Sequence, residues 1–534
     1  MWGRNIFKWS EISIKSSAQK LYSKIDERAR FAFVSAFVIG FITHCFSFFN
    51  LYLNHDGIKN IYGFTDMTSS GRWLLKPACL LSGDACLPVI IGLLSILYLS
   101  AACALITEMF KVQNKGFIAL ISAFIVTFPS VTKTFTYMFT ADGYMLSFLL
   151  AAAAVFLAKR RRFGFLPASL LVCLSLGIYQ ASVSVCIILF MLVIAIDILD
   201  GEKTKQIYIR ISKYISCGVL GCGLYYAALK AIIAIKGVAL TNYKGADKLS
   251  LDLNSFKNAV VNLIPKNLAL ILADGQFGFC GKKFLGVSLA ALTMIAVVLV
   301  LLRANSMKLY KRPLVFLLLP VLFFSLPFMM FCILFISPGA GYYAVMLSSF
   351  SIVFAALPII FDRYLSVSSL ITFLHKYLMV ALSVLFISHF VIFANFTYVR
   401  GAVQTKNTEA LMTNIVSELY TIDNFTKKPL IITSRSYDKE GGKGPNYMSE
   451  RARYIFLGFV KYEASAEDFI YEDLTIYLKL YYGLDCTPMK HAQFTEIKQK
   501  CAGKLDDSAA DTGRAYDIFE HDGKIIIVLN NYLK

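Results

Sequence analysis

The sequence predicts a mainly α-helical protein that crosses a membrane about eleven times and carries a small α/β domain at its C-terminus. Three observations predict this fold class. Of the 534 residues, 57% are hydrophobic and only 16% are charged, whereas soluble proteins average about 25% charged residues. Apolar runs long enough to cross a bilayer recur along residues 31–398. Residues 399–534 have the composition of a water-soluble chain.

Each predicted span is an apolar run of roughly 20 residues, the length that a helix needs to cross the hydrocarbon core. Lipid offers the backbone no hydrogen-bond partner, so each such run is expected to be helical. The runs lie at residues 31–53, 87–110, 116–132, 142–158, 164–178, 181–199, 213–235, 286–302, 313–336, 342–361 and 377–398. The polar residues 1–30 do not have the pattern of a signal peptide. We expect a cytoplasmic segment on the membrane surface there.

The charges of the connections predict the orientation. The connections on one side contain 16 basic residues, whereas the three short ones on the other side contain only Lys133. The 16 are Lys111, Lys115, Lys159, Arg160, Arg161, Arg162, Lys203, Lys205, Arg210, Lys213, Arg303, Lys308, Lys311, Arg312, Arg363 and Lys376. Because basic residues concentrate in cytoplasmic connections, the N-terminus is predicted inside. An odd number of spans then places the C-terminal domain outside.

The net charge of +19 does not indicate nucleic acid as a partner. Residues 400–534 contain 18 basic and 19 acidic residues, so the basic excess lies entirely beside the predicted spans. Basic residues in that position face anionic lipid headgroups. We therefore predict a lipid bilayer as partner and no nucleic acid.

Two longer outer segments, 54–86 and 236–285, interrupt the membrane domain at 31–398. The tail at 399–534 begins with an amphipathic stretch that contains Leu411, Ile415 and Leu419. It continues with the strand-like runs PLIITS, RYIFLGFV and KIIIVLN, which predict a small α/β domain. Five cysteines fall in outer segments, where a disulfide such as Cys486 to Cys501 is one option.

The first outer segment concentrates ionisable residues near the membrane surface. Asp56, Asp66, Arg72 and Lys76 all lie there. A carboxylate and an arginine in one crevice can act as a general base and a phosphate clamp. The alternative interpretation is a hydrated loop whose charges only avoid lipid.

Four more candidates lie at the predicted outer ends of spans. Lys133 and Asp142 end consecutive spans, and Tyr179 and Gln180 form an uncharged outer turn. Gln and Tyr can hydrogen-bond and stack on a sugar. Each also has a purely structural interpretation. In it, Lys133 reaches the interface, Asp142 stabilises a helix N-terminus and Tyr179 anchors its span in the interface.

The sequence contains no phosphate-binding loop, no dinucleotide-binding glycine motif and no D-x-D. Its six histidines show no metal-ligand spacing. We therefore predict no cofactor and no zinc site, while a divalent metal is not indicated but stays open.

Four segments, in order, resemble the Gtr-type membrane glucosyltransferases of the GT-C class. They are NHD at 54–56, SGRWL at 70–74, ADGYMLS around Asp142 and LSLGIYQAS at 174–182. The resemblance is best over the first 200 residues, rests on hydropathy over 200–398 and is weak in the tail. It implies a GT-C-like bundle that moves a sugar, typically glucose, from a polyprenyl-phosphate donor to a surface glycan such as O-antigen. The site would lie at the outer face of a bacterial cytoplasmic membrane.

The resemblance also implies roles for the candidate residues. Asp56 maps onto the expected catalytic carboxylate. His55 stands where many members of the family carry a second acid, which argues against a carboxylate pair or a metal-dependent variant. The phosphate ligands would be Arg72, Lys133 and Lys76, and the sugar or acceptor ligands Asp66, Asp142, Tyr179 and Gln180.

Two rival hypotheses stay open on the sequence alone. A secondary transporter or a lipid-linked-glycan flippase would also be polytopic and basic inside, although transporters tend to place ionisable groups near the membrane midplane. A non-catalytic scaffold would use the outer tail for recognition, but it leaves the carboxylate and arginine of the first outer segment unexplained.

Overall fold

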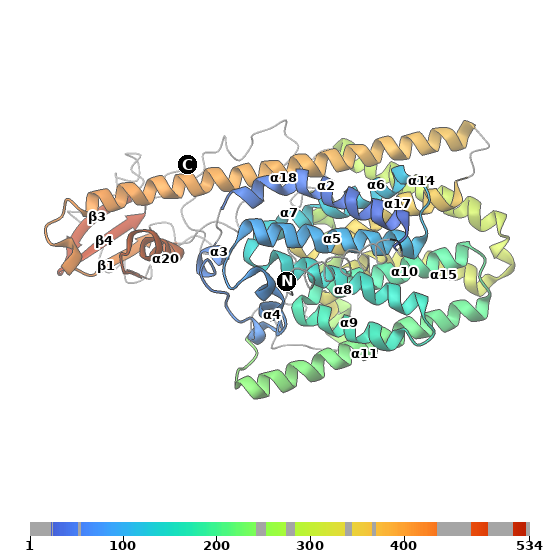
Figure 1. The fold of residues 1–534 in the computed structure, drawn as a ribbon, viewed down its shortest axis with the longest axis horizontal. Helices are drawn as coiled ribbons and strands as arrows, with labels where there is room; N and C mark the ends of the chain where they lie inside the picture. The colour runs from blue at the N-terminus through green and yellow to red at the C-terminus, as the bar shows by residue number, and fades with distance from the viewer. Residues whose placement is uncertain are drawn as a thin grey trace, which may run out of the picture.

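The computed structural model describes residues 23, 25–51, 55–241, 253–273, 283–336, 344–365, 370–434, 471–489 and 516–529. They form a long helical bundle with a small sheet beyond one of its ends (Figure 1). The main helices of the bundle are α2 (Glu27–Phe49), α5 (Pro88–Phe110), α6 (Lys115–Thr127), α7 (Pro129–Phe135), α8 (Ala141–Arg160), α9 (Phe165–Ile178), α10 (Val183–Leu199), α11 (Thr204–Lys236), α14 (Lys283–Ser306), α15 (Pro313–Met330), α17 (Ser348–Tyr364) and α18 (Leu370–Leu419).

Shorter helices connect the main ones. Between the spans these are η3 (Met138–Thr140), η4 (Gln180–Ser182), α12 (Leu253–Asn258), the π-helix η6 (Ala259–Leu263), α13 (Ile264–Ala273), η7 (Leu309–Lys311), α16 (Ile333–Ile336) and η8 (Ala344–Met346). The first outer segment contains α3 (His55–Lys59), η1 (Thr68–Ser70), α4 (Leu75–Cys79) and η2 (Leu80–Ser82). That segment is therefore folded and not an open loop.

Helices occur at all eleven predicted span positions. Within the described residues, eight helices are long and apolar enough to cross a membrane. The pair α6 and α7, bent by 42°, makes a ninth when it counts as one span. The bend lies at Pro129, which cannot donate a backbone hydrogen bond into the preceding turn. At the two remaining positions α9 has 14 residues and α17 has 17, so both are shorter than a full span.

The bundle has two rows of helices. In the first, α2, α5, α8, α9 and α11 pack side by side in that order. In the second, α6, α17, α10 and α15 do the same, and contacts of α2 with α6 and of α8 with α10 join the rows. The helices α14 and α18 pack beside the second row and on each other. Many faces of α11, α14 and α15 stay exposed and apolar, as lipid-facing helices require.

Small residues bring the helices of the first row together. A Cβ atom at Gly92 of α5 would lie 2.2 Å from the ring of Phe48 of α2. A Cβ atom at Gly40 of α2 would lie 3.0 Å from Ile96 of α5. In a bilayer, helix association depends on such close packing because lipid removes the hydrophobic driving force.

The basic connections gather at one end of the bundle. Arg363 binds Asp200 with Nε and Nη2 and the carbonyl of Phe110 with Nη1, at 2.5 to 3.1 Å. Lys159 donates to the carbonyl of Met109 at 2.8 Å. These bonds join residues at four connections that the sequence analysis predicted on the same side of the membrane.

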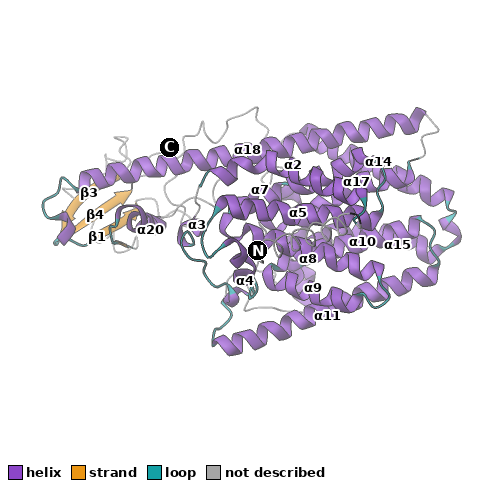
Figure 2. Ribbon diagram, in the orientation of Figure 1, coloured by secondary structure: helices purple, strands orange, loops and turns teal. Residues whose placement is uncertain are grey.

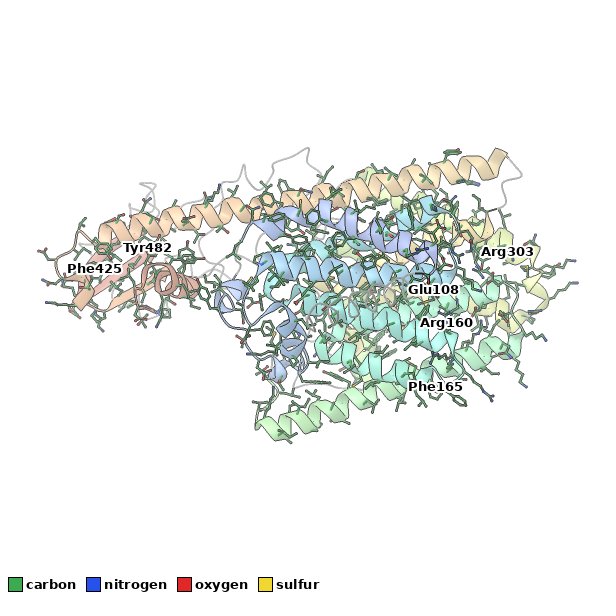
Figure 3. The ribbon with its side chains drawn as sticks, in the orientation of Figure 1. Glu108, Arg160, Phe165, Arg303, Phe425 and Tyr482 are labelled. Carbon is green, nitrogen blue, oxygen red and sulfur yellow. The ribbon has the colours of Figure 1, made fainter. Side chains whose placement is uncertain are left out.

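Figure 3 shows the two opposite ends of the molecule. Glu108, Arg160 and Arg303 lie toward the end with the basic connections, and Phe425 and Tyr482 lie at the other. Arg160 pairs with Glu108 at 2.7 Å. The basic connections thus lie at the end of the molecule opposite the C-terminal unit.

The helix α18 runs without a break from the bundle into the C-terminal region (Figure 1). The predicted domain boundary at residues 398 and 399 lies inside this 50-residue helix. Its amphipathic outer part, with Leu411, Ile415 and Leu419, packs on the small sheet. The two parts of the molecule are therefore joined by a helix and not by a flexible linker.

The described residues of the C-terminal unit form α18 from Leu411 onward, η9 (Phe425–Lys427), α20 (Tyr471–Tyr482) and a four-stranded sheet. The strands are β1 (Leu430–Ser434), β2 (Cys486–Pro488), β3 (Tyr516–His521) and β4 (Lys524–Leu529), in the order β2-β1-β4-β3. Only the pair β3 and β4 is antiparallel. Figure 2 shows the strands in this unit, apart from the bundle.

The sheet confirms two of the three predicted strands, since PLIITS contains β1 and KIIIVLN contains β4. The core strand β4 is buried from Ile525 to Leu529, which explains its continuous apolar run. One face of the sheet packs on α18 and α20. The opposite face carries Ile526, Val528 and Met489.

Some predictions fall outside the described residues: the cytoplasmic segment up to residue 22, RYIFLGFV at 453–460, and Cys501 as a partner for Cys486. Cys79, Cys86 and Cys486 of the outer segments are free thiols in the structure. Burial raises the pKa of Cys86 and of Cys486 to about 12, so both thiols stay protonated at neutral pH.

Candidate active site

The first outer segment folds over the outer end of the bundle and is held by its own polar groups. Asp84 accepts a hydrogen bond from the Phe64 amide at 3.0 Å. Lys76 donates to the Phe64 carbonyl at 2.8 Å and lies 3.5 Å from Asp84. The Phe64 ring packs on Phe139, with centroids 5.6 Å apart. Lys76 thus lies within the fold of this segment.

Arg72 lies against two stacked tyrosines, one from α8 and one from the turn after α9. Its Nη1 donates a hydrogen bond to the phenol oxygen of Tyr144 at 3.1 Å. The guanidinium carbon lies 5.5 Å from the Tyr179 ring centroid and 6.0 Å from that of Tyr144. The two rings are stacked at 4.0 Å with 13° between their planes. This arrangement holds a cation against aromatic faces, a geometry that favours arginine.

Asp56 is half-buried in the first turn of α3. Its carboxylate is close enough to Tyr144 to interact with it electrostatically, as is Arg72. The structure therefore brings Asp56, Arg72, Tyr144 and Tyr179 into one neighbourhood from three parts of the chain. An acid and a guanidinium that both act on one phenol can together receive a proton and bind an anion.

The loop that carries Arg72 is fixed by two side chains. Gln180 donates from Nε2 to the Ser70 carbonyl at 3.0 Å, and Tyr225 of α11 donates to the Gly71 carbonyl at 3.0 Å. Gly71 has φ +81°, and a Cβ atom there would lie 2.7 Å from Gln180 Nε2 and 2.8 Å from the Tyr225 oxygen. Glycine is therefore required both for the turn and for the close approach.

Asp66 lies at the edge of the same loop and is paired with the end of α11. Lys236 Nζ lies 2.5 Å from Asp66 Oδ2, and the Thr68 hydroxyl and amide donate to Oδ1. Partial burial acts to raise the pKa of Asp66, but the hydrogen bonds from Lys236 and Thr68 prevail and lower the pKa below its ordinary value. Asp66 thus connects the loop to α11.

Asp142 is fully buried near the start of α8. Its Oδ1 accepts a hydrogen bond from the Gly143 amide at 2.9 Å, and Cys79 and Ser82 lie beside the carboxylate. Gly143 itself packs on Leu75 of α4, where a Cβ atom would lie 2.8 Å from that side chain. Asp142 therefore faces α4 and η2.

Lys133 is buried on α7, with 8% of its surface exposed. The helix α7 packs on α18 and η8, and more weakly on α8. The helix of Lys133 thus reaches α8, which carries Tyr144, only through its weaker contacts. Within the described ranges, no three His, Cys, Asp or Glu side chains come together as a metal site.

The sequence analysis singled out Arg72 and Tyr179 but missed the contributions of Tyr225 and Lys236. Both belong to α11. Tyr225 lies in the middle of its apolar run, and Lys236 is its last residue. A tyrosine within an apolar run and a lysine at its end are both common in membrane spans. No pattern along the chain therefore distinguishes these two residues. Only the packing of α11 against η1 gives these two residues their partners.

Comparison with known proteins gives one match. The family model of the glucosyl transferase GtrII matches residues 45–361, which includes every candidate residue of the bundle. No curated protein and no solved structure matches the chain. Since the family model covers more than half of the 534 residues, the chain belongs to the glucosyl transferase GtrII family.

Proposed function

We propose that this protein transfers a glucosyl residue from a polyprenyl-phosphate donor to a hydroxyl of a cell-surface glycan such as O-antigen. The family supports glucosyl transfer over the transporter and scaffold hypotheses. The observation that carries the proposal is the neighbourhood of Asp56 and Arg72 around Tyr144 and Tyr179. It supplies one carboxylate and one fixed guanidinium, which are the two groups that this reaction needs.

The reaction needs a base but no general acid. A sugar bound through C1 to a lipid phosphate has a leaving group that departs as an anion. Asp56 accepts the proton of the acceptor hydroxyl while its oxygen forms the bond to C1. The bond between C1 and the phosphate oxygen breaks, and the polyprenyl phosphate leaves with the electron pair. A single displacement of this kind inverts the anomeric configuration.

Arg72 binds the phosphate as negative charge accumulates on it, which is where preorganised electrostatics contribute most. The stacked tyrosines hold the guanidinium in place before the donor arrives. Lys76 and Lys133 add positive charge on the phosphate side. On the sugar and acceptor side we assign roles to Asp66, Asp142, Tyr179 and Gln180.

The proposed site faces the outer side of a bacterial cytoplasmic membrane. The positive-inside rule supports this orientation, because the basic connections lie at the end opposite the C-terminal unit. The N-terminus is then cytoplasmic, and the C-terminal unit is extracytoplasmic. The acceptor glycan reaches the site from the side of that unit.

The test is transfer of radiolabelled glucose by the purified protein in lipid nanodiscs. The donor is undecaprenyl-phosphate-glucose, the acceptor is the isolated surface glycan of the host, and wild type is compared with Asp56→Asn. Asp485→Asn is the matched control, because Asp485 is an exposed carboxylate of the C-terminal unit that pairs with exposed Lys479.

We expect wild type and Asp485→Asn to label the glycan and Asp56→Asn to lose about 10²- to 10⁴-fold in rate, as removal of a positioned base predicts. Equal rates for Asp56→Asn and wild type would disprove the role of Asp56. Movement of labelled lipid across a bilayer without label in any glycan would instead establish transport.

A further inference from the structure

The helix that carries Asp56 is packed against the C-terminal unit. Ile58 of α3 and Ile61 just beyond it are 1% and 8% exposed, although they belong to an outer segment. Both belong to the hydrophobic core of the C-terminal unit, together with Leu474 and Leu478 of α20. Contacts between α3 and α20 confirm the same packing. About 400 residues separate the two contact partners in the sequence.

Polar groups join the same helix to the rest of the first outer segment. Asn60 donates from Nδ2 to the Asp56 carbonyl at 2.8 Å, and its Oδ1 accepts from the Thr65 amide at 2.8 Å. The carbonyl of Ile61 accepts from the Cys86 amide at 3.0 Å, just before α5 begins. One side of α3 is thus fixed to the outer segment, which leads directly into α5, and the other side to the C-terminal unit.

The helix α3 has only five residues, too few to be stable alone in water. Its conformation therefore depends on what packs against it. The C-terminal unit is itself held at the bundle by the continuous helix α18, so it forms a fixed surface. A displacement of α3 by one ångström moves Asp56 relative to Arg72 and Tyr144.

We propose that the C-terminal unit positions Asp56 for catalysis through the contact of Ile58 with α20, so that Ile58 is a positioning residue. This inference rests on the proposed function, in which Asp56 is the base. It gives the C-terminal unit a direct part in the chemical step, in addition to any contact with the acceptor.

The test combines kinetics with a measurement that does not depend on activity. The full-length variants Ile58→Val, Ile58→Ala and Ile58→Asp are compared with wild type in nanodiscs. For each we measure kcat, the KM for undecaprenyl-phosphate-glucose, and hydrogen–deuterium exchange of the amides of 57–61. Val528→Ala is the matched control, since Val528 is fully buried on the opposite face of the sheet.

We expect Ile58→Ala to lower kcat about 10- to 100-fold with an unchanged donor KM, as for a base displaced by about 1 Å. Exchange of 57–61 should accelerate in this variant. Ile58→Val should behave as wild type, and Ile58→Asp should lose the most activity because its carboxylate cannot stay buried without a partner. Val528→Ala should keep both its kcat and its slow exchange at 57–61.

The proposal is overturned if Ile58→Asp keeps the kcat of wild type, or if Val528→Ala loses kcat as much as Ile58→Ala does. Asp56→Asn in the same assay separates two failures. If it is inactive while the Ile58 variants are fully active, only the positioning role fails. If it is fully active, the assignment of Asp56 as the base fails and the positioning role fails with it.

Discussion

Arg72 donates a hydrogen bond to the phenol of Tyr144, with 3.1 Å between Nη1 and the phenol oxygen, while its guanidinium lies 5.5 Å from the Tyr179 ring centroid. The two tyrosines come from α8 and from the turn after α9, and their rings are stacked. The cation is therefore oriented from two directions before any donor binds. This preorganisation distinguishes Arg72 from the many basic residues that only flank the spans.

The first prediction concerns the guanidinium itself. Arg72→Lys keeps the positive charge but loses the planar fork that stacks on Tyr179 and that the proposed mechanism uses to bind the donor phosphate. We expect kcat to fall about 100-fold, in the range seen when one preorganised donor is removed. Glucosyl transfer at saturating donor measures the effect. Arg312→Lys, at the opposite end of the bundle, is the control, and equal activity of the two variants would contradict the role of Arg72.

The second prediction concerns Gly71. Gly71→Ala forces a methyl group into the space of Gln180 and Tyr225, at a residue with φ +81°. We expect a loss of about 1–3 kcal/mol in stability, as for other strained backbone positions, and a loss of transfer activity because Arg72 follows directly. Thermal unfolding and the transfer assay test both.

The matched control for Gly71 is Gly63→Ala in the same outer segment. A Cβ atom at Gly63 meets nothing within 4 Å, so this variant should behave as wild type. If Gly71→Ala were as stable and as active as Gly63→Ala, the close approach of Gln180 and Tyr225 would not matter.

The third prediction concerns pH. The pKa of Asp66 is lowered in the folded protein, from an ordinary value of 3.8. Its ion pair with Lys236 therefore contributes stability that is fully present above about pH 4 and is lost as the pH falls through the lowered folded pKa. Because both side chains are about two-fifths exposed, we expect the ion pair to contribute less than about 1 kcal/mol to the free energy of unfolding. The Tm difference between wild type and Asp66→Asn should shrink between pH 6 and pH 3.

The fourth prediction concerns a buried histidine. His44 Nε2 lies 2.8 Å from the Val126 carbonyl, which can only accept, so this nitrogen carries the proton. Nδ1 then accepts from the Tyr398 hydroxyl at 2.6 Å. Tyr398→Phe leaves that buried acceptor unsatisfied and should cost about 1–3 kcal/mol. Thermal unfolding tests this, with exposed Tyr310→Phe as the control. Equal Tm values would show that another donor takes over.

Local patterns along the chain predicted much of the bundle. Helices occur at each apolar run, β1 and β4 occur at two of the three strand-like runs, and α18 carries Leu411, Ile415 and Leu419 on its buried face. Hydropathy and periodicity are properties of short segments, so they can be read without knowing what packs where. The short helices α9 and α17 show the limit of this approach, because apolar length alone does not give the ends of a helix.

The sequence by itself determined the membrane character and the type of residue available for chemistry, and it predicted the side of each connection. These follow from apolar length and local charge, which the bilayer selects segment by segment. Only the tertiary structure decided that Arg72 lies against the stacked rings of Tyr144 and Tyr179, that Gln180 fixes its loop, and that Ile58 packs on the C-terminal unit. Such contacts join residues far apart in the chain and depend on packing, which leaves no periodic signal in the sequence.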